Sequence, residues 1–72
     1  MPHISVNLYK GVDEKRKKGM TKAVQEALME FGPWKSSDIS VSFMELEPEK
    51  FEGYVKEKTE MEELVIPSDY IK

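Results

Sequence analysis

The first two residues, Met1 and Pro2, are the part of this sequence best suited to chemistry. Bacterial aminopeptidases remove an initiator methionine when the second side chain is small, and proline meets that condition. The mature chain would then begin with Pro2, whose nitrogen would be a secondary amine instead of an amide. An ordinary α-amino group titrates near ~7.7–8.0, and burial beside another cation lowers that pKa. A free Pro2 is therefore suited to act as a general base and then as a general acid near neutral pH.

Length and composition exclude several other kinds of site. The 72 residues are expected to form one domain, residues 1–72, and so short a chain needs oligomerisation to enlarge its core. Cysteine is absent and His3 is the one histidine, so we expect no metal site and no disulfide. The net charge of -3 argues against nucleic acid as a partner. Because no apolar run approaches the ~20 residues of a membrane span and no signal-peptide pattern is present, we expect a cytoplasmic protein without a membrane partner.

Apolar periodicity predicts two strands joined by a helix. Apolar and polar residues alternate over 3–9 and again over 39–44, as in strands with one apolar face. Between them, apolar residues recur at helical spacing over about five turns, with Asp13 as the expected N-cap and Gly32 as the expected C-cap. This order predicts a right-handed parallel βαβ unit. The expected core consists of its apolar residues: Ile4, Val6, Leu8, Met20, Ala23, Val24, Ala27, Leu28, Phe31, Ile39, Val41 and Phe43.

The remainder of the chain predicts an extra helical segment. Pro48 suits the first position of a helix, and the spacing of apolar residues predicts a short helix over 48–57. A second helix or an irregular segment follows, and Pro67 ends it. The tail that contains Tyr70 and Ile71 is too apolar for a free end, so we expect it to dock on a neighbour.

Taken in order, these features resemble the tautomerase superfamily, whose small enzymes use an amino-terminal proline as catalytic base. The matching segments are Pro2-His3-Ile4-Ser5-Val6, the helix start Asp13-Glu14-Lys15, the strand entry Ser37-Asp38-Ile39-Ser40-Val41, and Phe51. The resemblance covers residues 2–55 and is closest to the PptA-like branch, which shares the Pro-His-Ile opening. It implies an α+β fold in which the βαβ unit, with its parallel strands and extra C-terminal helical segment, dimerises into a four-stranded sheet with helices on one face. Hexamers made of three dimers also occur in this superfamily.

The resemblance also implies an activity and a site. The chain would be a keto–enol tautomerase, an isomerase that needs no cofactor and acts on small 2-hydroxy-dienoate or enolpyruvate-type acids. Pro2 would be the catalytic residue at the base of a pocket between subunits, and Phe51 aligns with the aromatic that lines that pocket. His3 lies beside the base, and Lys10 lies in the first turn as a candidate point charge. Ser40 is a further candidate for binding substrate.

Two residues depart from the pattern of the 4-oxalocrotonate tautomerases. That group carries two arginines for substrate carboxylates, and the aligned positions here hold Val12 and Ser40. Neither side chain can replace a bidentate guanidinium, so we expect a monocarboxylate substrate held by Lys10. Two alternatives remain: hydration or dehalogenation of unsaturated haloacids on the same fold, and a non-catalytic oligomeric member. If Met1 is retained, the Pro2 nitrogen is a tertiary amide and cannot be a base.

Overall fold

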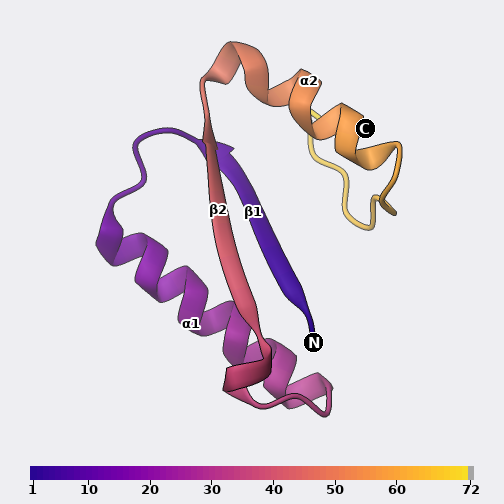
Figure 1. Cartoon of the computed structure of the whole chain (residues 1–72). Helices are drawn as coiled ribbons and strands as arrows, with labels where there is room; N and C mark the ends of the chain where they lie inside the picture. Colours follow the sequence, from indigo (N-terminus) through magenta and orange to yellow (C-terminus); the bar gives the residue numbers. More distant parts are fainter. Residues whose placement is uncertain (72) are drawn as a thin grey trace.

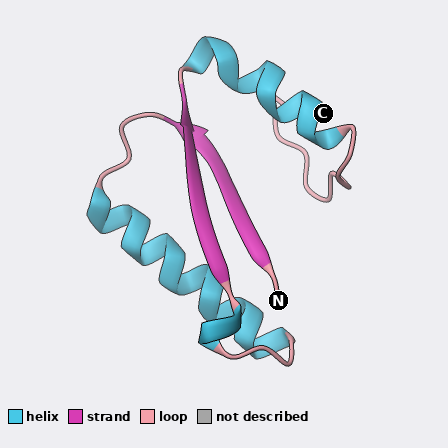
Figure 2. Ribbon diagram, viewed as in Figure 1, coloured by secondary structure: helices cyan, strands magenta, loops and turns pink. Residues whose placement is uncertain are grey.

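The computed structural model describes residues 1–71, which form a parallel βαβ unit followed by a second helix (Figures 1 and 2). The elements are β1 (His3–Tyr9), α1 (Glu14–Phe31), the 3-10 helix η1 (Ser36–Asp38), β2 (Ser40–Leu46) and α2 (Pro48–Thr59). β1 and β2 pair in parallel, which confirms the predicted βαβ unit. The second strand begins one residue later than predicted because Ile39 ends η1, where its N–H bonds to the Ser36 carbonyl at 3.2 Å. Within residues 1–71 no helix is both long and apolar enough to cross a membrane.

The register of the two strands gives the sheet one apolar and one polar face. His3 lies opposite Ser40 and Ile4 lies opposite Val41, so both strands alternate in phase. One face holds the half-buried residues Ile4, Val6, Leu8, Val41 and Phe43, and the other exposes His3, Ser5, Ser40 and Ser42. Helix α1 covers the apolar face, where the Lys17 ammonium lies 6.0 Å from the centre of the Phe43 ring. The predicted alternation is therefore confirmed.

The first turn of α1 forms as the sequence predicts. Gly11 adopts a φ of 106°, which favours glycine and turns the chain after β1. Asp13 then caps the helix, since its carboxylate accepts the Arg16 backbone N–H at 2.8 Å.

Gly32 is the C-cap of α1, as predicted, and its N–H bonds to the Leu28 carbonyl at 2.9 Å. Gly32 follows α1 with an extended backbone, at a φ of −131°, and not in the left-handed conformation that favours a glycine cap. A Cβ at this position would run into the ring of Trp34. Glycine is needed at this helix end because it lets the Trp34 ring lie close to the backbone.

The predicted core stripe of α1 is only partly right. Met20, Val24 and Leu28 are half-buried, whereas Ala23 and Ala27 are exposed and Phe31 is 85% exposed. Neighbouring strands lie about 4.8 Å apart while a helix is about 10 Å wide, so two strands cover only part of the apolar stripe. Among residues 1–71, only Ile39 and Ile71 are buried apolar residues, and each keeps a small exposed fraction, 8% and 6%. One chain therefore has a very small core, as expected for a chain of this length.

Helix α2 covers one end of the opposite face of the sheet. Tyr9 belongs to the polar-face side of β1, and its ring meets Phe51 of α2 edge to face, with centroids 5.1 Å apart. Pro48 is the first residue of α2, as predicted, and the helix ends at Thr59, two residues later than predicted. The segment beyond Thr59 is irregular, and Ile71 is buried within its own chain while Tyr70 stays 69% exposed. The tail thus docks through Ile71 alone, and on the same chain.

Candidate functional site

Pro2 is held at the start of β1 by the neighbouring strand. Its carbonyl accepts the Ser40 backbone N–H at 3.2 Å, and the residue is half-buried. Met1, by contrast, is 95% exposed. Removal of Met1 would therefore cost little packing and would leave Pro2 tied to β2.

His3 bridges two hydroxyl groups of the adjacent strand. Its Nδ1 lies 2.7 Å from the Ser40 Oγ and its Nε2 lies 3.1 Å from the Ser42 Oγ. A neutral imidazole donates through one nitrogen and accepts through the other, and a hydroxyl can do either, so both bonds can form together. His3, Ser40 and Ser42, here called the His3 cluster, form a polar patch directly beside Pro2.

Two members of the His3 cluster were predicted from the sequence, and one was missed. His3 and Ser40 were candidates for binding substrate, and the structure brings them together. Ser42 was not a candidate. The strand register could have identified it, because a side chain at the start of β1 reaches residues two apart on the same face of β2.

Lys10 lies at the other end of β1 and already has a partner. Its ammonium is 2.8 Å from a carboxylate oxygen of Glu47, and its backbone N–H bonds to the Leu46 carbonyl at 3.1 Å. The hydrogen bond and charge of Glu47 raise the pKa of Lys10, and Glu45 and Glu49 raise it further. Lys10 is thus a cation in acidic surroundings and not a free point charge.

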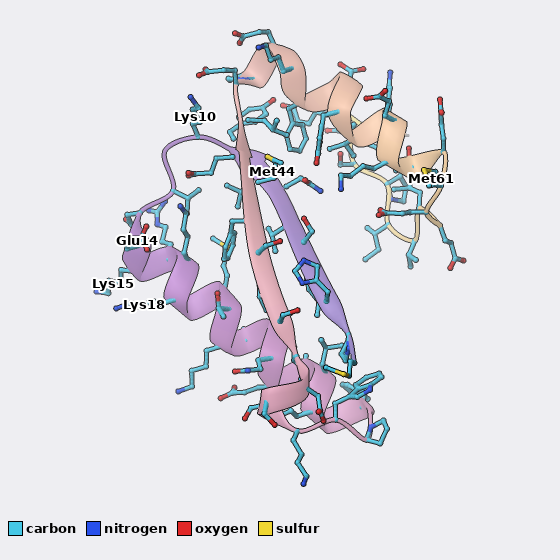
Figure 3. All side chains as sticks on the ribbon, viewed as in Figure 1. Lys10, Glu14, Lys15, Lys18, Met44 and Met61 are labelled. Carbon is cyan, nitrogen blue, oxygen red and sulfur yellow. The ribbon has the colours of Figure 1, made fainter. Side chains whose placement is uncertain are left out.

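Pro2 and Lys10 cannot share a pocket within one chain. They stand at opposite ends of β1, and eight steps of ~3.3 Å place them about 26 Å apart. That is more than twice the ~10 Å over which salt screens exposed charges, so within one chain the Lys10 charge does not act on the Pro2 nitrogen. Figure 3 shows Lys10 on the turn beyond β1, far from the start of that strand.

Phe51 belongs to the Lys10 end and not to the Pro2 end. It is half-buried and meets Tyr9 with an angle of 88° between the ring planes. In a single chain it packs α2 against β1 and does not line a pocket around Pro2. The five predicted site residues therefore separate into two groups: Pro2, His3 and Ser40 at one end of β1, and Lys10 and Phe51 at the other.

A groove outside both groups lies between α1 and β2. Its volume is about 340 Å³, and it is lined by Glu14, Lys17, Lys18, Thr21, Lys22, Gln25 and Phe43. None of the predicted site residues lines it. No group of three or more potential metal ligands occurs among the described residues 1–71.

Comparison with protein-family models and with curated proteins found no match to this chain. The likeness to the tautomerase superfamily thus rests on the residues quoted above and on their order.

Proposed function

We propose that this chain is a keto–enol tautomerase in which Pro2 is the general base and general acid. The observation that carries the proposal is the position of Pro2, which is hydrogen-bonded to β2 through its carbonyl and next in sequence to the His3 cluster. The proposal requires Pro2 to be the first residue of the active chain. Its nitrogen is then a secondary amine at a fixed place beside several polar hydrogen-bonding groups.

The reaction moves one proton within a small 2-hydroxy-dienoate or enolpyruvate-type acid. The Pro2 amine takes the proton from the enol oxygen, the electron pair of that O–H bond becomes the C=O π bond, and the electron pair of the enol C=C bond moves to the carbon that is to be protonated. The same proton then passes from the Pro2 ammonium to a carbon of the conjugated system, so no cofactor is consumed. While the oxygen carries negative charge, a hydroxyl of Ser40 or Ser42 can donate a hydrogen bond to it.

A second copy of the chain would unite the two groups of site residues. β1 pairs with β2 along one edge, and its other edge has no partner strand among residues 1–71. If the β1 strands of two copies pair in antiparallel fashion, the start of one lies opposite the end of the other. Lys10 and Phe51 of one copy would then approach Pro2 of the other, in the four-stranded sheet of a homodimer.

The acidic surroundings of Lys10 favour a monoacid substrate. The ion pair between Lys10 and Glu47 is solvent-exposed and therefore weak, so a substrate carboxylate can replace Glu47 on Lys10 at small cost. A second carboxylate near Lys10 would face the negative charges of Glu45 and Glu49. A desolvated charge without a partner is costly, and we therefore expect a dicarboxylate to react less well than a monoacid.

Mixing two inactive variants tests the proposal. The first carries one additional residue before Pro2, which converts the proline nitrogen into an amide and leaves every side chain in place. The second is Lys10→Ala with a free Pro2. The assay is ketonisation of phenylenolpyruvate, followed by ultraviolet absorbance and compared with the wild-type chain after intact mass has confirmed that Pro2 is its first residue.

We expect the extended variant to lose about 10²–10⁴-fold in rate, the usual contribution of general acid–base catalysis. Mixing and refolding the two variants together should restore activity, since a mixed dimer has one site with a free Pro2 and an intact Lys10. An extended variant as active as the wild type would exclude Pro2 as the base. Full activity in the Lys10→Ala variant alone would exclude Lys10 from the site and leave Pro2 in place.

A further inference from the structure

We infer that the loop after α2, residues 60–66, binds the groove between α1 and β2 of another copy of this chain. This contact goes beyond the proposed function and does not depend on it. The inference rests on the exposure and charge of the loop, on the shape and charge of the groove, and on their positions on opposite sides of the sheet.

The loop exposes a run of apolar side chains between acidic ones. Glu60, Glu62 and Glu63 are exposed, and the apolar residues are exposed by 92% at Met61, 39% at Leu64, 75% at Val65 and 83% at Ile66. Single exposed apolar residues are ordinary, but a contiguous group of this kind marks a surface that another molecule covers.

Both ends of the loop are fixed to the rest of the chain. At its start, the N–H groups of Met61 and Glu62 each bond to the Lys58 carbonyl at 3.0 Å. Beyond its end, Ile71 is buried and its N–H bonds to the Ser68 hydroxyl at 3.2 Å. The loop is therefore held in place while its apolar side chains project into solvent, which lowers the entropy lost when it binds.

The groove carries lysines, which are opposite in charge to the glutamates of the loop, beside an aromatic side chain. Phe43 forms its apolar side, and Lys18 and Lys22, one helical turn apart, stand on its rim. Lys17 is already occupied, because its ammonium lies 3.8 Å from Glu14 and 3.3 Å from Glu45. Within residues 1–71, the ion pairs include no partner for Lys18 or Lys22. Two cations and an apolar wall are thus available to a ligand with acidic and apolar groups.

The loop of the same chain cannot fill this groove. The groove lies on the Phe43 face of the sheet, whereas α2 and the loop follow from the Tyr9 side. In Figure 3, Lys18 and Met61 lie on opposite sides of the molecule, with both strands between them. The occupant must therefore come from a second copy. The contact joins two different surfaces, so copies would associate head to tail, each loop in the groove of the next copy, as a closed ring or an open chain.

Charge reversal on each side of the contact provides the test. One variant carries Lys18→Glu and Lys22→Glu, and the other carries Glu62→Lys and Glu63→Lys. A control with Lys35→Glu and Lys50→Glu changes the net charge by the same amount as the first variant, away from the groove. Sedimentation equilibrium at fixed protein concentration measures the association of each one alone, and then of the two test variants mixed in equal amounts.

We expect each test variant to associate at least about tenfold more weakly than the wild type, while the control associates as the wild type does. The mixture should associate again, because the acidic loop of the first variant matches the basic groove of the second, and the basic loop of the second matches the acidic groove of the first. A monomeric wild type, test variants that associate normally, or a mixture that does not regain association would each overturn the inference. The changes at Glu62 and Glu63 lie in an exposed loop, so loss of folding cannot explain their effect.

Discussion

Replacing Phe51 with leucine tests how α2 is held on the sheet. The rings of Tyr9 and Phe51 lie 5.1 Å apart and nearly perpendicular, and α2 contacts the sheet mainly through β1. An aromatic pair in this geometry contributes about 0.5–1.5 kcal/mol beyond the apolar area that it buries. Leucine keeps much of that area and removes the ring, so Phe51→Leu should lower the free energy of unfolding by about 1 kcal/mol. For a domain of this size, that loss corresponds to about 4–8 °C in melting temperature.

A double-mutant cycle separates the ring contact from general packing. Tyr9→Leu, Phe51→Leu and the double variant are compared with the wild type by urea unfolding at one protein concentration, because association would otherwise change the apparent stability. We expect a coupling energy of about 0.5–1.5 kcal/mol between the two sites. Effects that add within about 0.3 kcal/mol would show that the rings do not interact, and would refute this account of how α2 docks.

The same two variants also test whether Phe51 contacts substrate. If Phe51 serves only to dock α2, then Tyr9→Leu and Phe51→Leu should change kcat/KM to a similar degree. If a second copy brings Phe51 to Pro2, Phe51→Leu should raise KM for an aromatic enol acid while Tyr9→Leu leaves KM nearly unchanged. Steady-state kinetics on phenylenolpyruvate distinguishes these two outcomes.

Variants at three further residues test single contacts. Gly32→Ala should cost about 1–3 kcal/mol of unfolding free energy, because its Cβ overlaps the Trp34 ring, and most of that cost should vanish in a Trp34→Ala background measured by circular dichroism. Asp13→Ala removes the cap on the Arg16 N–H and should cost about 1 kcal/mol by urea unfolding, whereas Asp13→Asn should retain most of the stability. Glu47→Gln should increase the affinity of Lys10 for a substrate carboxylate and so lower KM. Glu47 raises the pKa of Lys10, so the ion pair stabilises the fold below pH 10.5, and this stabilisation is lost as the pH rises through the raised pKa. In the Glu47→Gln variant, the free energy of unfolding should therefore change less with pH above 10.5.

The sequence predicts this fold well where a residue's environment depends on its near neighbours. The alternation over residues 3–9 identified β1, because successive side chains of a strand point to opposite faces whatever lies beyond them. Asp13 marked the start of α1 for the same reason, since a capping side chain reaches a backbone N–H only three residues away. In both cases the interaction that decides the structure is local.

Predictions that depended on distant residues were less accurate. Helical spacing alone predicted Phe31 in the core, but Phe31 is exposed. The sheet covers only part of the apolar stripe of α1, and the width of the sheet cannot be read from the sequence of the helix. At Gly32 the sequence predicted the helix cap itself, but the close approach of the Trp34 ring, which leaves no room for a Cβ, depends on how the chain folds back after the helix. The missed Ser42 and the Glu47 partner of Lys10 likewise depend on strand register and on a turn approaching from another part of the chain.

The separation of Pro2 from Lys10 connects the proposed activity to the state of assembly. In one chain, the strand pairing places two hydroxyls and an imidazole beside Pro2, and Lys10 lies about 26 Å away by strand length. A single copy would therefore have to bind a substrate carboxylate through the His3 cluster. Two copies paired along β1 can instead use Lys10 of the other chain. If specific activity and the mass measured by sedimentation fall at the same protein concentration on dilution, the result favours the shared site. Activity that persists in the monomer would assign substrate binding to the His3 cluster.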